Sequence, residues 1–259
     1  GFSILGAGSK SDKLALGFQL FDADGDGLLD REEVAAYLRS FLTLLFALTV
    51  HASQMPAEDV YALIDRRALE IAADVVASST DAYGAASFEE FGAWYNGGGN
   101  ELIPWIELLD LKKWPFSSPA VAESAGAMLE FPLSSDGDDT LRIQQQDIDD
   151  LQVILSRTQL HTAEVETLHE LFHNVSDDGE KLTKRGFDFA IRELVPGESL
   201  SDEDKEFLSL ALSNIFFAFD RTGDGEVDLA EFASGFSILG AGSKSDKLAL
   251  GFQLLDADG

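Results

Sequence analysis

The chain has 259 residues, and 47 Asp and Glu against 18 Lys and Arg give it a formal net charge of −29 at pH 7. Such a charge repels phosphates and anionic headgroups, so we expect no nucleic-acid partner and no acidic membrane surface as a partner. Hydrophobic residues make up 45%, including 19 Phe, which is too many for a disordered acidic tail, and the absence of Cys excludes disulfides. We therefore expect a folded acidic protein, in a cellular compartment that composition leaves open.

The first candidate site is the segment 22–33, DADGDGLLDREE. Oxygen-bearing residues recur at alternate positions of a twelve-residue loop, with Gly27 at the sixth position, where the backbone has to bend sharply. A hard cation such as Ca²⁺ takes six to eight oxygen ligands, and this spacing supplies them. The match to the loop pattern therefore favours a Ca²⁺ site over a solvated acidic turn. The predicted ligands are Asp22, Asp24, Asp26, the carbonyl of Leu28, Asp30 and Glu33.

The segments after this loop predict a buried helix and then a connector of a different kind. The apolar stretch 41–50 is about half the length of the roughly 20 residues that a membrane helix needs, so we expect it to be buried in the protein. A Gly-rich break at 96–100 ends the first helix-rich block. The segments 128–134 and 140–144 alternate around an acidic turn, which predicts a β-hairpin with Pro132 on an edge strand. We expect that turn to be solvated rather than a metal site, because it lacks the bend Gly and the closing Glu.

The pentapeptide 169–173, HELFH, matches the HExxH pattern of zinc-dependent hydrolases. Its neighbours Leu168, Leu171 and Phe172 form a core face on the same helix, and no third zinc ligand follows at a suitable spacing. We therefore favour a helix with partly exposed His residues over a zinc site. Since P-loop, dinucleotide-binding and serine-hydrolase motifs are also absent from the sequence, we expect no enzymatic activity.

A second twelve-residue loop, DRTGDGEVDLAE at 220–231, follows a segment with helical periodicity at 207–219. Gly225 occupies the bend, and Thr222 replaces an acid at the third position. The missing carboxylate predicts weaker Ca²⁺ binding than in the first loop. The predicted ligands are Asp220, Thr222, Asp224, the carbonyl of Glu226, Asp228 and Glu231.

The segment 1–25 recurs at 235–259 with a single difference, Phe21 against Leu255. Agreement this close indicates recent tandem duplication rather than a single unit whose ends overlap. We therefore expect the chain to be one repeat of a larger protein, followed by the start of the next repeat.

The two complete loops resemble those of the EF-hand, calmodulin-like superfamily, which uses helix–loop–helix hands in pairs. The resemblance implies a partner hand for each, and eroded candidates are present at 79–90 and 175–186. In paired hands the hydrophobic residues at position 8 face each other, which predicts Leu29 opposite Ala86 and Val227 opposite Leu182. The order eroded, complete, complete, eroded, read across the repeat boundary, is similar to the neuronal calcium sensor and calcineurin B branch.

We thus predict a mainly α fold of paired EF-hand lobes joined by a connector with a small β-hairpin. The expected divisions are an EF-hand pair at 1–98, the connector at 99–160, a second pair at 161–234 and the start of the next repeat at 235–259.

Near-identical repetition favours one function, a Ca²⁺-binding repeat of a long fibrous scaffold whose partners are neighbouring copies. The alternative is a Ca²⁺ sensor that binds a separate target helix. The segment Pro104 to Trp114, PWIELLDLKKW, either docks within the chain as such a helix or fills a small core of the connector. The sequence does not set the Ca²⁺ affinity.

Overall fold

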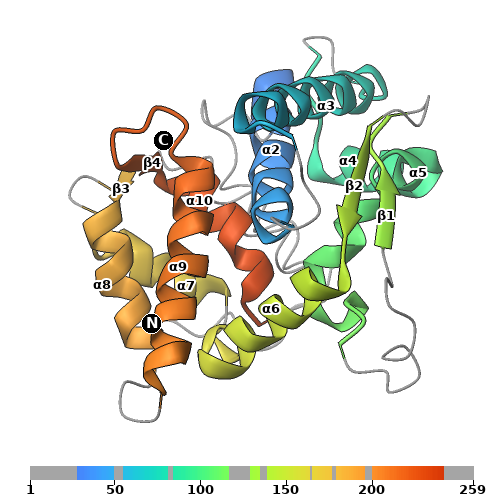
Figure 1. Cartoon of the computed structure of the whole chain (residues 1–259). Helices are drawn as coiled ribbons and strands as arrows, with labels where there is room; N and C mark the ends of the chain where they lie inside the picture. Colours follow the sequence, from blue (N-terminus) through green and yellow to red (C-terminus); the bar gives the residue numbers. More distant parts are fainter. Residues whose placement is uncertain are drawn as a thin grey trace, which may run out of the picture.

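The computed structural model describes residues 28–49, 55–80, 84–116, 129–134, 139–163, 165–176, 179–195 and 200–241. Over these ranges the fold is mainly α with two small antiparallel sheets, which confirms the predicted fold class (Figure 1). The α-helices are α2 (Arg31–Leu48), α3 (Ala57–Ala77), α4 (Phe88–Trp94), α5 (Asn100–Leu102), α6 (Gln145–Arg157), α7 (Val165–His173), α8 (Lys184–Leu194), α9 (Asp202–Phe219) and α10 (Leu229–Phe236). Shorter turns of helix are η1 (Tyr95–Gly99), η2 (Pro104–Leu109), η3 (Leu111–Lys113), η4 (Leu160–Thr162) and η5 (Ser237–Leu239), and the strands are β1 (Leu129–Pro132), β2 (Thr140–Ile143), β3 (Lys181–Thr183) and β4 (Glu226–Asp228).

Side-chain caps start the helices that leave the loops. Asp30 accepts hydrogen bonds from the amides of Glu32 and Glu33 and so begins α2, while Ser87 accepts from the Glu90 amide and begins α4. Thr183 and Asp228 cap α8 and α10 in the same manner. Each cap satisfies an amide that the first turn of a helix leaves without a partner, so the loop and its exit helix are fixed together.

Short backbone pairings join the hands two by two, as predicted. Leu29 and Ala86 exchange two backbone hydrogen bonds of 2.9 and 2.8 Å, and Leu182 lies opposite Val227 in the β3–β4 pair. All four side chains are buried. Both expected pairings are therefore confirmed, and in each of them a complete hand pairs with an eroded one.

The connector contains the predicted hairpin, in which Leu129 pairs with Ile143 and Pro132 with Thr140. The helical turn η2 contacts β1, and η3 contacts η2. Trp105 and Ile106 are fully buried, and the indole nitrogen of Trp114 donates to the Leu108 carbonyl at 2.8 Å. The apolar side chains of segment 104–114 are therefore part of the core, and the contact of η2 with β1 agrees with the interpretation that the segment packs within the connector.

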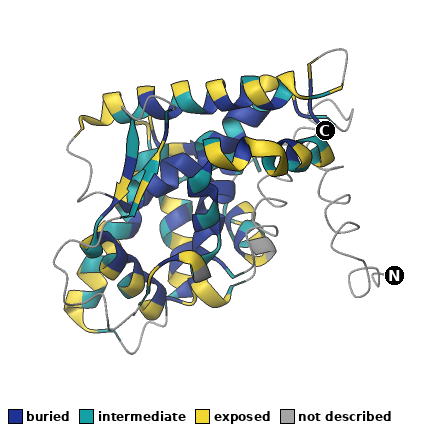
Figure 2. Cartoon of the chain, turned by 90° about the vertical axis from the view of Figure 1, so that its right-hand side faces the viewer, coloured by how far each residue is buried: buried dark blue, intermediate teal, exposed yellow. Residues whose placement is uncertain are grey.

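Helix α2 lies at the centre of the molecule, with α3 across one side and α10 on another (Figure 1). Its apolar residues from Phe41 to Leu48 are largely buried, as expected for this stretch. The buried side chains of the hands and the connector form one continuous hydrophobic cluster, visible as the dark interior in Figure 2. Contacts between α2 and α10 therefore join the two hand pairs directly.

The closest approach in this contact is at Gly235 on α10. A Cβ atom there would overlap the Ser40 carbonyl oxygen of α2 and lie 2.7 Å from Cζ of Phe219. The Ser40 hydroxyl, fully buried, also lies 3.1 Å from that of Ser234. The two helices thus meet backbone to backbone at a position where only Gly fits.

Candidate metal centre

The loop 220–231 is described in full, and its backbone curls around the first predicted ligand. The Asp220 carboxylate accepts hydrogen bonds from the amides of Gly223 at 2.8 Å, Asp224 at 3.2 Å and Gly225 at 2.9 Å. Gly225 has φ of 82°, the left-handed conformation that the bend position requires. The Thr222 hydroxyl lies 3.5 Å from Asp220, so the first ligands of the loop are gathered at one end.

The closing residue Glu231 has a different environment. Its amide donates to Asp228 at 2.8 Å, as in a helix cap, but its carboxylate accepts from Nη1 of Arg39 at 2.8 Å. Burial raises the pKa of Glu231 above its usual value, and the Arg39 guanidinium offsets this only in part. The predicted ligand is thus paired with a cationic side chain from another hand.

Only the second half of the first loop lies within the described residues. Leu28, Asp30 and Glu33 are placed there, whereas Asp22, Asp24 and Asp26 lie outside them. The Glu33 carboxylate accepts from the Asp30 amide at 2.8 Å, so it folds back toward its own loop.

The eroded loop 79–90 is closed by its own side chains. Glu90 accepts from the Ser87 amide at 3.0 Å, the Thr80 amide at 2.9 Å and the Thr80 hydroxyl at 2.7 Å. The Ser87 amide and then Thr80 lower the pKa of Glu90 to about 2, because each hydrogen bond favours the charged carboxylate. Hydroxyl and amide donors thus surround the carboxylate oxygens of the residue at the metal-closing position.

The eroded loop 175–186 is closed by a different set of contacts. The Ser176 hydroxyl donates to the Lys181 carbonyl at 2.6 Å and accepts from the Gly179 amide at 3.0 Å. At the closing position, a Cβ on Gly186 would lie 2.9 Å from the Val175 carbonyl oxygen. A Glu at that position would therefore be crowded as well as lacking an acidic partner at position 1.

The HELFH segment forms part of α7, with Phe172 buried and His173 exposed. The ring centroids of His169 and His173 are 5.9 Å apart. Burial, and then the neighbouring His173, lower the pKa of His169 to about 4. These His residues are thus half-buried or exposed on an amphipathic helix, as expected.

Among the residues that the structure describes, no three Asp, Glu or His side chains lie close enough together to hold a metal ion. The oxygen-bearing side chains of the loop 220–231 suit a hard cation. The bend at Gly225 lies where the loop pattern predicts it, and the loop amides fold around the Asp220 carboxylate. The arrangement departs from that loop at Glu231, whose carboxylate Arg39 holds. The ligand set proposed from the sequence therefore remains a prediction, and Glu231 is the member that has to change partners.

Four residues in or around this loop were not predicted from the sequence to take part in the site. Arg39 on α2 also contacts Asp65 of α3 at 3.0 Å, and Asp65 accepts two hydrogen bonds from Arg221, of 2.7 and 2.9 Å. The guanidinium of Arg221 also lies 4.9 Å from the ring centre of Tyr61. One signal was available: Arg39 is the sole basic residue between Glu32 and the end of α2.

The comparisons with known proteins agree with the loop geometry. The EF hand family model matches residues 14–36 and 215–237, which include both complete loops. A recoverin family protein of Dictyostelium discoideum is 30% identical over 129 residues, 49% of this chain and 54% of that protein. Calcineurin B-like protein 5 of Arabidopsis thaliana is 32% identical over 112 residues, 42% of this chain and 50% of that protein.

A further match, phospholipase D B of Dictyostelium discoideum, is 29% identical over 132 residues, which are 51% of this chain and only 10% of that protein. The chain therefore spans about half the length of the recoverin and calcineurin B-like relatives and a tenth of the phospholipase. No solved structure matches the chain. None of the helices in the described ranges has the length and apolarity that a membrane crossing requires. The chain therefore contains two EF-hand motifs, the motif that binds Ca²⁺, and it is similar to the recoverin and calcineurin B-like proteins over about half of their length.

Proposed function

We propose that this chain is a Ca²⁺ sensor module, not an enzyme, which binds a helix of a separate protein when its complete loops are loaded. The support is that its relatives include recoverin family and calcineurin B-like proteins. The repeat at 235–259 favoured the fibrous scaffold, but none of the relatives described above is named for a fibre. The sensor alternative therefore has the better support.

In each complete loop the predicted ligands would hold the ion through carboxylate, hydroxyl and carbonyl oxygens. In the second loop these are Asp220, Thr222, Asp224, the Glu226 carbonyl, Asp228 and Glu231. Bound Ca²⁺ would neutralise carboxylates that otherwise repel one another. Because Asp228 caps α10 and Glu231 lies in its first turn, loading the loop acts directly on that helix.

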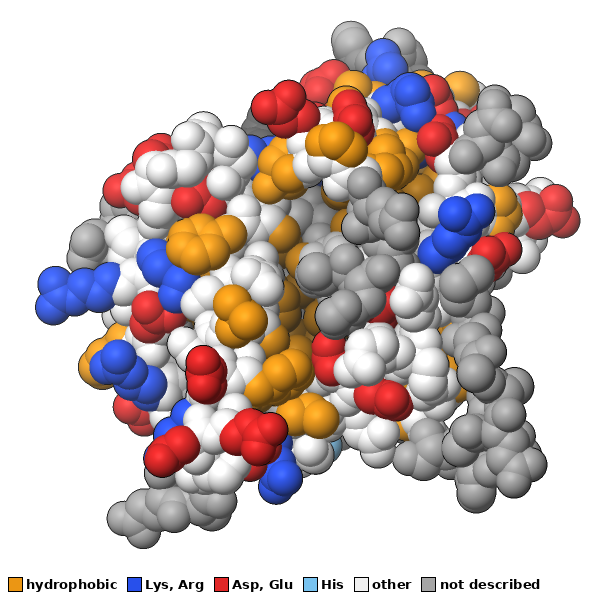
Figure 3. Space-filling view, in the orientation of Figure 1, with side chains coloured by type: hydrophobic (Ala, Val, Ile, Leu, Met, Phe, Trp, Pro, Cys, Tyr) orange, Lys and Arg blue, Asp and Glu red, His pale blue; other side chains and the backbone are white. Residues whose placement is uncertain are grey.

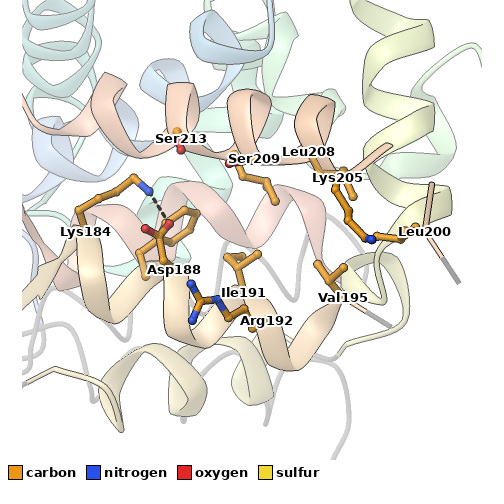
Figure 4. Close-up of a pocket in the computed structure, with 12 residues that line it drawn as sticks. Lys184, Asp188, Ile191, Arg192, Val195, Leu200, Lys205, Leu208, Ser209 and Ser213 are labelled. Atoms are coloured by element: carbon orange, nitrogen blue, oxygen red, sulfur yellow. Dashed lines mark hydrogen bonds and ion pairs between the residues drawn. The ribbon is translucent and has the colours of Figure 1, made fainter. Parts of the chain in front are cut away.

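A groove between α8 and α9 is the proposed target site. It has a volume of about 500 Å³ and lies between two helices of the second hand pair (Figure 4). Apolar side chains form much of it, and basic side chains lie among them. The apolar lining is Phe187, Ile191, Val195, Leu200, Leu208 and Leu212, and the basic lining is Lys184, Arg192 and Lys205.

This lining favours an amphipathic helix with apolar residues on one face and acidic residues beside them. Lys184 pairs with Asp188 and Lys205 with Asp202, whereas the ion pairs within the described ranges include none of Arg192. Arg192 is therefore the groove cation that a carboxylate of the target would pair with. Helix α8 has 11 residues, which is a length of about 16 Å, so a target helix of about three turns would fill the groove. On the face of the molecule shown in Figure 3, apolar side chains gather in a hollow, and charged side chains of both signs lie around it.

The first test is Ca²⁺ titration by calorimetry, with an apolar fluorescent probe, anilinonaphthalene sulfonate, added in parallel. We expect two Ca²⁺ per chain, with an increase of probe fluorescence on loading. Leu200→Asp in the groove should suppress that increase, and Phe189→Asp, at a side chain 57% exposed on α8 and outside the groove, is the matched control. A chain that binds Ca²⁺ without any change in probe fluorescence would contradict the sensor function.

A further inference from the structure

Four alternating charges connect the second loop to the first hand pair. Glu231 of α10 pairs with Arg39 of α2 at 2.8 Å, and Arg39 pairs with Asp65 of α3 at 3.0 Å. Asp65 in turn accepts from Arg221 at 2.7 Å. Glu231 and Arg221 both belong to loop 220–231, so the chain of charges leaves that loop, crosses α2 and α3, and returns to it.

The closing Glu of this loop is the exception among the three closing Glu residues. Glu33 and Glu90 both accept a hydrogen bond from the amide of their own helix cap. Glu231 has its carboxylate on Arg39, in an ion pair whose side chains are only 21% and 27% exposed. A pair shielded from water to this degree is screened less than a surface pair, so exchanging one partner for another has a substantial effect on its free energy.

We propose that Arg39 sets the Ca²⁺ affinity of loop 220–231 by competing with the cation for Glu231, and that it couples this loop to the first one. The inference rests on the proposed Ca²⁺ site in loop 220–231. To give both oxygens to a cation, Glu231 has to release Arg39, which then keeps Asp65 as its partner. The Arg39 contact therefore opposes loading of the second loop.

The coupling follows from the position of Arg39 on α2. Glu33, the predicted closing ligand of the first loop, lies on the same helix about two turns before Arg39. One rigid helix thus carries a ligand of the first site and the competitor of the second. Any movement of α2 on loading the first loop changes the Arg39–Glu231 pair, and the effect has to be reciprocal between the two sites.

The contact between α2 and α10 does not depend on this ion pair. The helices also meet at Gly235, and the Ser40 and Ser234 hydroxyls are 3.1 Å apart in the buried part of the contact. Removing the charge of Arg39 should therefore leave the fold in place. Met is the substitution of choice, because it keeps an unbranched apolar stem of similar length.

The experiment is calorimetric titration of the whole chain with Ca²⁺ alone, in the wild type and in Arg39→Met. We expect the site in loop 220–231, identified by its loss in Glu231→Gln, to bind about tenfold more tightly in Arg39→Met. The matched control is Arg66→Met, which removes a cation of α3 that pairs with Asp139, outside both complete loops. Equal shifts in the two Met variants would reduce the effect to net charge and overturn the proposal.

A second variant predicts the opposite sign. Among the contacts described above, Asp65→Asn leaves Glu231 as the remaining carboxylate partner of Arg39. Ca²⁺ should therefore bind loop 220–231 severalfold more weakly in this variant. The coupling has its own readout: Glu33→Gln should change the affinity of the second loop in the wild type but not in Arg39→Met. If neither Arg39→Met nor Asp65→Asn changed the Ca²⁺ affinity of either site, the role of Arg39 would be refuted while the Ca²⁺ sites themselves would stand. A stoichiometry that Glu231→Gln leaves unchanged would refute the site assignment and the inference with it.

Discussion

Replacing Gly235 by Ala tests whether the two hand pairs pack on each other through α2 and α10. The added methyl group would overlap the Ser40 carbonyl oxygen, and Cζ of Phe219 would lie 2.7 Å away. The Phe219 ring can turn aside, but the carbonyl belongs to the backbone of α2 and moves only with that helix. Gly235→Ala therefore has to separate α2 from α10 or distort one of them.

The expected cost is the difference between two opposing effects. Overpacking a filled contact costs about 1–3 kcal/mol, and the upper end applies here because a backbone atom is in the way. Replacing Gly by Ala within a helix returns up to about 1 kcal/mol. We therefore expect Gly235→Ala to lower the free energy of unfolding by about 2 kcal/mol, and more if α10 detaches.

The assay is urea unfolding with a Ca²⁺ chelator present, because bound Ca²⁺ would add a stabilising contribution of its own. The control is Gly92→Ala in α4, where no heavy atom lies within 4 Å of the new methyl group. This control should raise stability by up to about 1 kcal/mol through helix propensity alone. If Gly235→Ala matched Gly92→Ala in stability, the close contact between α2 and α10 would not exist in solution.

Three further predictions concern the eroded hands and α7. The pKa of Glu90 is about 2 instead of the usual 4.5, so the stability that its ionised carboxylate contributes is complete above pH 4.5 and is lost as the pH falls toward 2. NMR titration of the Glu90 carboxyl group checks this pKa, and Thr80→Ala should raise it. Gly186→Glu should add no third Ca²⁺ in calorimetry and should destabilise the chain in urea, because its Cβ would lie 2.9 Å from the Val175 carbonyl oxygen; an added ion would contradict this. His169, with a pKa of about 4 against the usual 6.5, contributes stability that is complete above pH 6.5 and is lost toward pH 4, so a proton NMR midpoint near 6.5 would disprove its burial.

The backbone pairings of the hands were predictable because they follow from position within a loop. Once loops 22–33 and 220–231 were recognised, the residues at position 8 identified Leu29 and Val227, and partners followed even where the acids had been lost. The hairpin with Pro132 was predictable for a similar reason, since alternation and turn residues are local signals. The expected division of the chain into 1–98, 99–160, 161–234 and 235–259 stays a prediction.

The ion pair at Glu231 was not predictable, because it joins residues 192 positions apart. A twelve-residue pattern specifies what Glu231 can bind but carries no information on which side chain packs against it. For Trp105 the sequence left two alternatives open, docking as a helix or filling a core of the connector, and the choice between them depends on how the connector folds back on its hairpin. Contacts of this kind depend on tertiary packing, which the local patterns do not encode.

The self-closure of loop 79–90 has a consequence for how the chain responds to calcium concentration. Since Glu90 already has amide and hydroxyl donors from Thr80 and Ser87, the entropy of ordering these three residues is lost when the protein folds rather than when an ion binds. Since loop 22–33 is the single predicted ion site of this pair, we expect the pair by itself to have a Hill coefficient of about 1, as for any single site. Any steeper dependence on calcium has to arise between the pairs, through the helix that both of them share.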